Sequence, residues 1–116
     1  MQREPPRRSL SNSGLRRSLV RVTTDVGVVV ARANGEKWPG RMLDVSVGGM
    51  QVACGRAPGF GEALTLVVQL RVGGRWLLLP ATVRWFTSRG FGAEFAALDE
   101  QQIAELAWFI DHNDET

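Results

Sequence analysis

The sequence is poor in the residues that build disulfides and metal sites. In 116 residues it has one cysteine, Cys54, and one histidine, His112. A single cysteine cannot form an internal disulfide, which agrees with a reducing compartment. One cysteine and one histidine also fall short of the ligand set that zinc requires. We therefore expect no metal site and no cofactor.

Long apolar runs are missing as well. No run approaches the roughly 20 residues that a membrane-spanning helix needs. The N-terminal stretch MQREPPRRSLSNSG is polar where a secretory signal would be apolar. We therefore expect a cytoplasmic protein without a membrane span.

Residue sets typical of catalysis are also missing. The chain has no second histidine, no serine–histidine–aspartate or cysteine–histidine set, and no P-loop. Its carboxylates fall mostly on expected turns or on an expected C-terminal helix, where they do not form a catalytic pair. We therefore do not expect an enzyme.

Positive charge is concentrated at the N-terminus. The net charge is +2, but six arginines against one acid give residues 1–21 a charge of +5, which leaves −3 for the remainder. Only one of the 14 basic residues is a lysine, and arginine is the side chain that forks onto phosphates and guanine edges. The N-terminal segment is either a solvated basic arm or an anion-binding arm.

The chain divides into a leader, one domain and a short tail. Residues 1–15 contain Pro5, Pro6 and Gly14 without periodicity, and we expect a flexible basic leader there. The remaining length suits one modest core. We therefore expect a single domain over residues 16–112 and a tail over residues 113–116.

Most of this domain shows the period-two alternation of β-strands. The clearest case is ALTLVVQLRV, residues 63–72, and a second long run reaches from Arg21 to about Ala33. A turn is expected over residues 33–40. Shorter strands are expected at about residues 41–45, 50–54, 75–86 and 91–95, with Trp85 facing inward. This pattern is typical of a small antiparallel barrel or sandwich, here ending near residue 98.

The period changes after residue 98. Asp99 and Gln102 resemble a capping box and predict a helix over about residues 99–112 that covers an edge or mouth of the barrel. The expected apolar stripe consists of Ile103, Leu106, Ala107 and Ile110. Trp108 falls opposite this stripe, so we expect it to be exposed and available for contact with a partner or a second copy.

The stretch LDVSVGGMQV, residues 43–52, interrupts the strand pattern. Asp44, Ser46, Gly48 and Gly49 cost packing and strand propensity there, so we expect a local role. One interpretation is a tight turn in which the polar side chains bond nearby N–H groups and one glycine takes a positive φ. The other is a polar pocket in which the bare backbone lets a ligand approach. The two interpretations are compatible.

Two motifs together resemble the PilZ domain family. RSLVR at residues 17–21 follows the pattern R-x-x-x-R, and DVSVGG at residues 44–49 follows D/N-x-S-x-x-G. VRW at residues 83–85 and GAEF at residues 92–95 resemble two further family strands. The resemblance covers about residues 16–112. It implies a six-stranded antiparallel β-barrel with one C-terminal α-helix.

The resemblance also implies a ligand, cyclic di-GMP, whose two phosphates and two guanine edges suit paired arginine forks. Arg17 and Arg21 would bind guanine edges and phosphates, because two guanidinium groups folded over one anion avoid the repulsion of a like-charge helical pair. Asp44 would accept from a guanine Watson–Crick edge, and Ser46 would contact phosphate or guanine. The full expected set is Arg16, Arg17, Arg21, Asp44, Ser46, Gly48 and Gly49.

The glycines and Arg16 have roles of another kind in this resemblance. Gly48 and Gly49 would offer room and backbone N–H groups. Arg16 is of the kind that, in this family, accompanies the binding of two stacked ligand molecules.

The expected function is that of a receptor or adaptor whose N-terminal arm changes conformation on binding and signals to an unidentified protein effector. A homodimer is left open. One alternative is a ligand-free protein-interaction adaptor of the same fold. Another is a small nucleic-acid-binding barrel, which would also use a basic arm. Nucleic acid is disfavoured because the expected strands lack an aromatic ladder and the barrel portion is net acidic.

Overall fold

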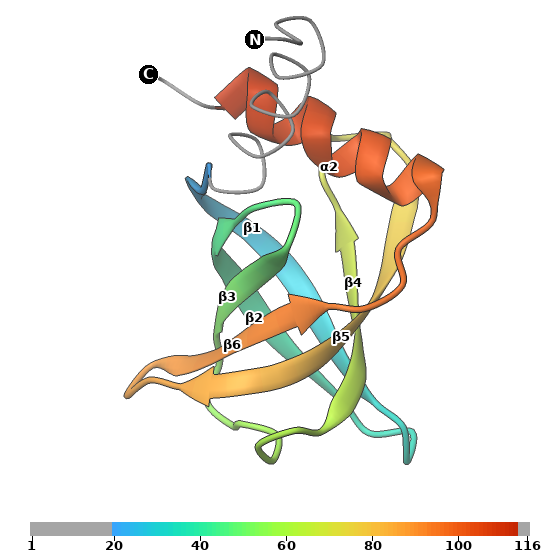
Figure 1. Cartoon of the computed structure of the whole chain (residues 1–116). Helices are drawn as coiled ribbons and strands as arrows, with labels where there is room; N and C mark the ends of the chain where they lie inside the picture. Colours follow the sequence, from blue (N-terminus) through green and yellow to red (C-terminus); the bar gives the residue numbers. More distant parts are fainter. Residues whose placement is uncertain (1–19, 114–116) are drawn as a thin grey trace, which may run out of the picture.

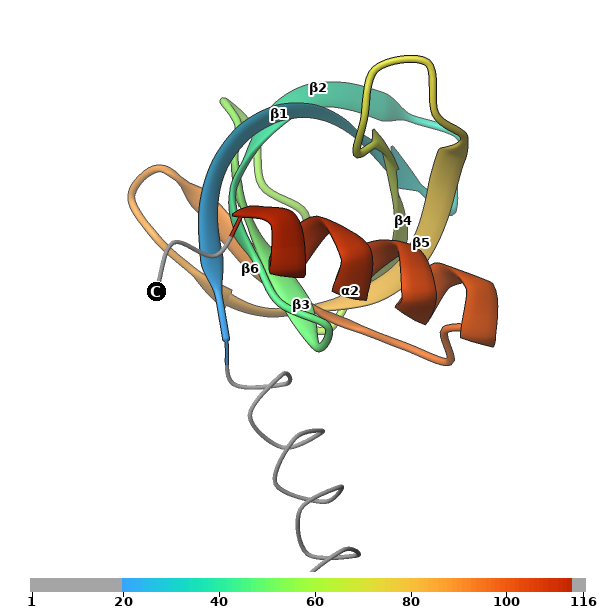
Figure 2. The ribbon, with the colours of Figure 1, turned by 90° about the horizontal axis from the view of Figure 1, so that it is seen from above.

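The part of the chain that the computed structural model describes, residues 20–113, forms a closed six-stranded antiparallel β-barrel with one helix across its end (Figures 1 and 2). The elements are β1 Val22–Arg32, β2 Lys37–Val45, β3 Gly49–Ala53, β4 Ala63–Gln69, β5 Trp76–Phe86, β6 Gly90–Phe95 and α2 Glu100–Asn113. Around the barrel the order is β1-β2-β3-β6-β5-β4, and β4 returns to pair with β1. The expected fold is confirmed. Arg16, Arg17 and the expected leader lie outside the described residues.

Alternate side chains of each strand fill the barrel. Val30 of β1 pairs with Leu66 of β4, which in turn pairs with Leu79 of β5, and all three are fully buried. Such cross-strand apolar pairs are what stabilises a barrel without free edges. Within the described residues, no helix is long and apolar enough to cross a membrane.

A β-bulge in β5 breaks the expected alternation. Val83 pairs with Ala93 and Trp85 pairs with Gly92, so Arg84 is an extra residue with no opposite partner. The extra residue reverses the direction of the side chains that follow it. Trp85 is therefore 44% exposed, and the prediction that it faces inward is wrong. Its ring crosses Gly92, where a Cβ atom would lie 2.1 Å from the indole.

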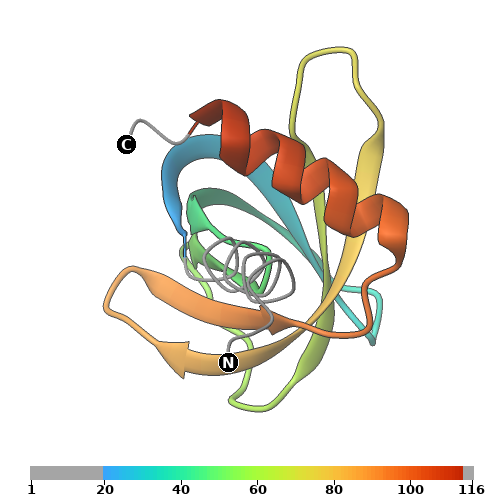
Figure 3. The same ribbon diagram turned by 45° about the horizontal axis from the view of Figure 1, so that its top comes forward.

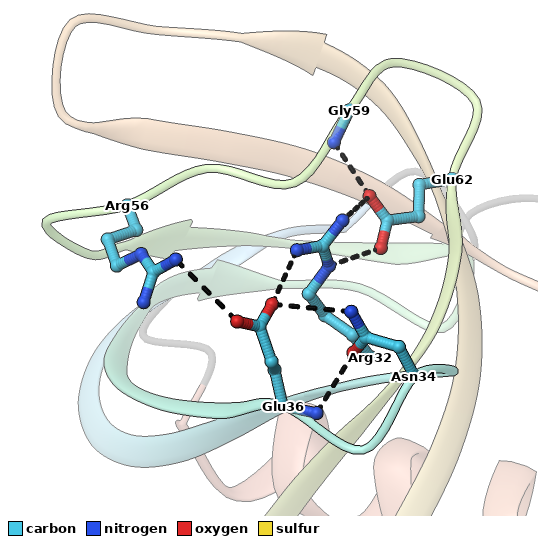
Figure 4. A network of polar contacts seen from close by, with 6 residues as sticks. All are labelled: Arg32, Asn34, Glu36, Arg56, Gly59 and Glu62. Atoms are coloured by element: carbon cyan, nitrogen blue, oxygen red, sulfur yellow. Dashed lines mark hydrogen bonds and ion pairs between the residues drawn. The ribbon is translucent and has the colours of Figure 1, made fainter.

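An ionic network closes the end of the barrel that lies away from the helix (Figure 4). The Arg32 guanidinium contacts the carboxylates of Glu62 and Glu36, each at 2.6 Å. Arg32 and Arg56 also lie over the Trp38 ring, with their Cζ atoms 5.3 and 4.5 Å from its centroid. Trp38 is buried, and β2 begins at residue 37 because Lys37 and Trp38 pair with Ala31 and Val30 of β1, so the turn is shorter than predicted.

The predicted capping box begins the helix. The Gln102 backbone N–H donates to Asp99 Oδ1 at 2.7 Å, and the Asp99 N–H donates to Gln102 Oε1 at 2.9 Å. The Gln102 amide also donates to the carbonyl of Leu78 at 2.7 Å, which fixes the start of α2 against β5. The capping box is confirmed, and it sets where α2 begins.

The buried face of α2 differs from the expected stripe. Leu106, Phe109 and Ile110 are buried, whereas Ile103 is 43% exposed. Trp108 is partly buried and packs against the core, so the prediction that it is exposed and faces away from the barrel is wrong.

Trp108 is partly covered by the loop between β4 and β5, which lies at the same end of the barrel as α2 (Figure 3). This loop brings the Arg71 Cζ atom to 4.2 Å from the centroid of the Trp108 ring, and the His112 ring stacks at 4.1 Å. A partner role for Trp108 stays a prediction.

Candidate ligand-binding site

The two expected halves of the site meet where β1 begins and β2 turns into β3, at the helix end of the barrel (Figure 1). Antiparallel pairing places Val22 opposite Val45 and Thr23 opposite Asp44. Arg21, which precedes β1, therefore lies beside Asp44 although 23 residues separate them. The pairing of two strands is what assembles the site.

The Arg21 guanidinium binds both polar residues of the second motif. Its Nε and one terminal nitrogen donate to Asp44 Oδ1 at 2.9 and 2.6 Å. The other terminal nitrogen donates to Ser46 Oγ at 3.2 Å. The side chains of Arg21 and Asp44 are 43% and 26% exposed, so this charge-assisted pair stays open to solvent and to a ligand.

Ser46 is the buried centre of the arrangement. It is 1% exposed, and its Oγ also accepts from the Gly48 N–H at 3.1 Å. Since the hydroxyl oxygen accepts both bonds, its one proton is left for donation. Ser46 thus stabilises the turn and also has a hydroxyl proton that it can donate to a bound group.

The tight-turn interpretation is correct for Ser46, whose hydroxyl accepts from a backbone N–H, and wrong for Asp44 and for the two glycines. The Ser46 N–H donates to the Gly49 carbonyl at 2.9 Å, but Asp44 binds Arg21 rather than a backbone N–H. Among the described glycines, a positive φ occurs at Gly35, Gly61 and Gly73. Neither Gly48 nor Gly49 has the predicted positive φ.

Gly48 and Gly49 differ in what the fold requires of them. A Cβ atom on Gly49 would lie 2.4 Å from the Ala93 carbonyl oxygen, so β3 and β6 approach too closely for a side chain. A Cβ atom on Gly48 would meet Ser46 Oγ at 3.8 Å, an ordinary contact. Packing explains Gly49, whereas Gly48 leaves open space at the site.

A pocket of about 320 Å³, here called the site pocket, opens beside these residues. It is lined by Arg21, Ser46, Gly48, Gly49, Met50, Arg84, Trp85, Ala93 and Glu94. Four expected site residues therefore line one pocket, while Asp44 contacts Arg21 and is not among the lining residues. Arg16 and Arg17 lie outside the described residues.

Sequence reasoning missed five of the pocket residues, and three of them, Arg84, Trp85 and Glu94, carry charged or aromatic side chains. The VRW motif predicts a strand, but strict alternation assigns Trp85 to the core. The bulge at Arg84 depends on the register between β5 and β6, which no local pattern reveals. A β-bulge next to a functional site is a common device for turning a side chain outward.

The site pocket combines features that suit an anionic aromatic ligand. Arg21 supplies a fork of donors, Ser46 a hydroxyl, and Trp85 an aromatic face on which a base can stack. Among the described residues, no group of three or more histidine, cysteine, aspartate or glutamate side chains could hold a metal ion. This chemistry fits nucleotide binding.

Solved structures share this fold. The PilZ domain of CeSA from a cellulose-synthesising bacterium has a TM-score of 0.65 and 21% identity, over 80% of this chain and 96% of that chain. The inhibitor of motility MotI/DgrA from Bacillus subtilis has a TM-score of 0.70 and 20% identity, over 84% of this chain and 52% of that chain.

A third structure contains the ligand that the motifs imply. The PilZ domain of YcgR from Escherichia coli, solved with c-di-GMP, has a TM-score of 0.69 and 14% identity, over 82% of this chain and 88% of that chain. At such identities these likenesses show the fold alone.

Sequence comparison shows the family more directly. No curated protein matches the chain. The family model for the PilZ domain, however, matches residues 15–112, which include both motifs and every element of the barrel. The chain therefore belongs to the PilZ domain family, a family of cyclic di-GMP receptors.

Proposed function

We propose that this protein binds cyclic di-GMP and signals to a protein partner through its N-terminal arm, without catalysing a reaction. The observation that carries the proposal is the Arg21 guanidinium, which Asp44 and Ser46 hold at the site pocket. A guanidinium that is already oriented loses less rotamer freedom when it binds a phosphate or a guanine edge. Arg21 is thus prepared for an anionic ligand.

The neighbouring residues contact different parts of the ligand. Asp44 uses Oδ1 for Arg21, so its second oxygen is the acceptor we assign to the guanine Watson–Crick edge. Ser46 donates its hydroxyl proton to the ligand, and Gly48 keeps the space open. Trp85 stacks on one guanine, because its ring lies on the outer face of β6 at the site pocket.

The arm completes the site. At about 320 Å³ the site pocket is near the lower end of the range for ligand pockets, so the described residues enclose only part of a cyclic dinucleotide. We assign the remaining contacts to Arg16 and Arg17. Fixing residues 16–20 on the ligand costs on the order of 1 kcal/mol or more per residue in backbone entropy, which offsets part of the contact energy. The ordered arm would present the surface that a partner recognises.

The similar structures support a signalling role of this kind. One belongs to a protein described as an inhibitor of motility, and another was solved with c-di-GMP. We propose by analogy that this chain acts by contacting a protein effector.

Thermal shift and calorimetry test the ligand. Cyclic di-GMP should raise the melting temperature, while GMP, cyclic GMP and a short oligonucleotide should not. A shift with the oligonucleotide alone would favour the nucleic-acid-binding alternative. No shift with any compound would favour the ligand-free adaptor.

Hydrogen exchange tests the arm. Backbone amides of residues 16–21 should exchange fast in the free protein and become protected with cyclic di-GMP. The strand β4 should stay protected in both states, since Leu64, Leu66 and Val68 are buried in the barrel. Equal protection of residues 16–21 with and without ligand would contradict the proposed arm movement.

A further inference from the structure

A second arginine, Arg84 of β5, lines the site pocket together with Arg21. It is the extra residue of the bulge in β5, immediately before Trp85. Its Nε donates to Glu94 Oε1 of β6 at 2.8 Å, and Glu94 lines the same pocket. The site pocket therefore holds an ion pair that neither motif includes.

The geometry of this pair leaves the cation able to bind a ligand. Only Nε of Arg84 is engaged by Glu94, and a guanidinium has two further nitrogens with four N–H donors. Within the described residues those terminal nitrogens have no hydrogen-bond partner. The two side chains are 52% and 61% exposed, so rotating Arg84 away from Glu94 breaks only a weak surface pair.

Among the described residues, each arginine at the site pocket is paired with one carboxylate. Arg21 faces Asp44, and Arg84 faces Glu94. The two phosphates of the proposed ligand bring two negative charges, which the Glu94 carboxylate repels and Arg84 attracts. Glu94 and the ligand therefore compete for the same guanidinium.

We propose that Arg84 is an additional ligand-binding residue, and that Glu94 is a competing counterion that holds affinity below what the arginines alone would reach. Arg84 binds a phosphate, or the O6/N7 edge of the guanine stacked on Trp85, through its terminal nitrogens. This inference rests on the proposed ligand. It extends the binding site from the β2–β3 turn to the outer face of β5 and β6.

The test is calorimetry with cyclic di-GMP on the full chain. Arg84→Ala should weaken binding by about tenfold, the loss typical of one charged hydrogen bond. The affinity of Arg84→Lys should lie between those of wild type and Arg84→Ala, because lysine keeps the positive charge but lacks the two-pronged donor geometry of arginine. Glu94→Gln should tighten binding by about two- to fivefold, and should have much less effect in the Arg84→Ala background.

The chain offers a matched control in Arg41 and Asp25. This exposed pair has a similar Nε to carboxylate contact, at 2.6 Å, and does not line the site pocket. Asp25→Asn removes the same charge as Glu94→Gln from the protein as a whole. Affinity in Asp25→Asn should stay within about twofold of wild type, because distant charges are screened by salt.

Each result separates this inference from the proposed function. If wild-type protein binds cyclic di-GMP and Arg84→Ala binds it equally well, the inference is wrong and the proposed ligand stands. Weaker binding by Glu94→Gln would also overturn it, since Glu94 would then contact the ligand itself. If the wild type does not bind at all, the proposed function fails. Melting curves verify that each variant is folded.

Discussion

Replacing the two adjacent glycines of the second motif by alanine should change the stability of the protein in opposite directions. Gly49→Ala should destabilise it, and Gly48→Ala should stabilise it. In Gly49→Ala the new Cβ atom would lie 2.4 Å from the Ala93 carbonyl oxygen, a backbone atom that cannot rotate away. In Gly48→Ala the nearest atom is Ser46 Oγ at 3.8 Å. One substitution therefore forces β3 and β6 apart, and the other is accommodated.

The magnitudes follow from these distances. Overpacking of this kind costs about 1 to 3 kcal/mol, so Gly49→Ala should lower Tm by about 4 to 12 °C for a domain of this size. Gly48 does not have a positive φ, so alanine fits its backbone and restricts the unfolded chain. Gly48→Ala should therefore stabilise the protein by about 0.4 to 1 kcal/mol.

Gly48→Ala should lower the affinity for the ligand while it raises the stability of the protein. Its new methyl group would occupy the site pocket next to Ser46, and we expect cyclic di-GMP affinity to fall although the protein melts higher. The assay is a melting curve and a calorimetric titration of each variant, with Gly27→Ala as control because a Cβ atom there meets nothing within 4 Å.

Two results would refute this reasoning. If Gly49→Ala melts at the wild-type temperature, β3 and β6 do not approach as described. If Gly48→Ala binds cyclic di-GMP as tightly as wild type, the open space beside Ser46 is not part of the ligand site.

Three further predictions concern single side chains. Arg21→Ala should abolish measurable cyclic di-GMP binding while lowering the unfolding free energy by no more than about 1 kcal/mol, since the pair with Asp44 is partly exposed; wild-type affinity would contradict the site. Trp85→Leu should remove most of the tryptophan fluorescence change on ligand addition and weaken binding by about 1 to 3 kcal/mol, the value of one base stack; an unchanged fluorescence response would place the base elsewhere. The hydrogen bond from Arg32, followed by that from the Gly59 N–H, lowers the pKa of Glu62 from its usual 4.5, so its stabilisation is present above about pH 4.5 and is lost as the pH falls through the lowered pKa. Urea unfolding should show a smaller loss of stability on acidification in Glu62→Gln than in wild type, and equal losses would contradict this role.

The elements that local patterns determine were predictable. The alternation over residues 63–69 reflects a strand with one buried face, and β4 is that strand; the predicted continuation to residue 72 is wrong, because Val72 lies exposed in the following loop. The capping box at Asp99 joins residues three apart in sequence, so the start of α2 can be read without knowing the rest of the fold. The pairing of Arg21 with Asp44 is different, because only the resemblance to the PilZ family linked two segments 23 residues apart.

Sequence alone therefore determined the strands, the closing helix and the two motifs, since each depends on residues close together in the chain. Tertiary structure decided which way particular side chains face. Trp85 points outward because the register of β5 on β6 contains an extra residue, Arg84, and Trp108 is partly covered because a distant loop brings Arg71 over its ring. Gly49 is required by the carbonyl of Ala93 on another strand rather than by its own φ. Such contacts join residues far apart in sequence, and periodicity within one segment carries no information about them.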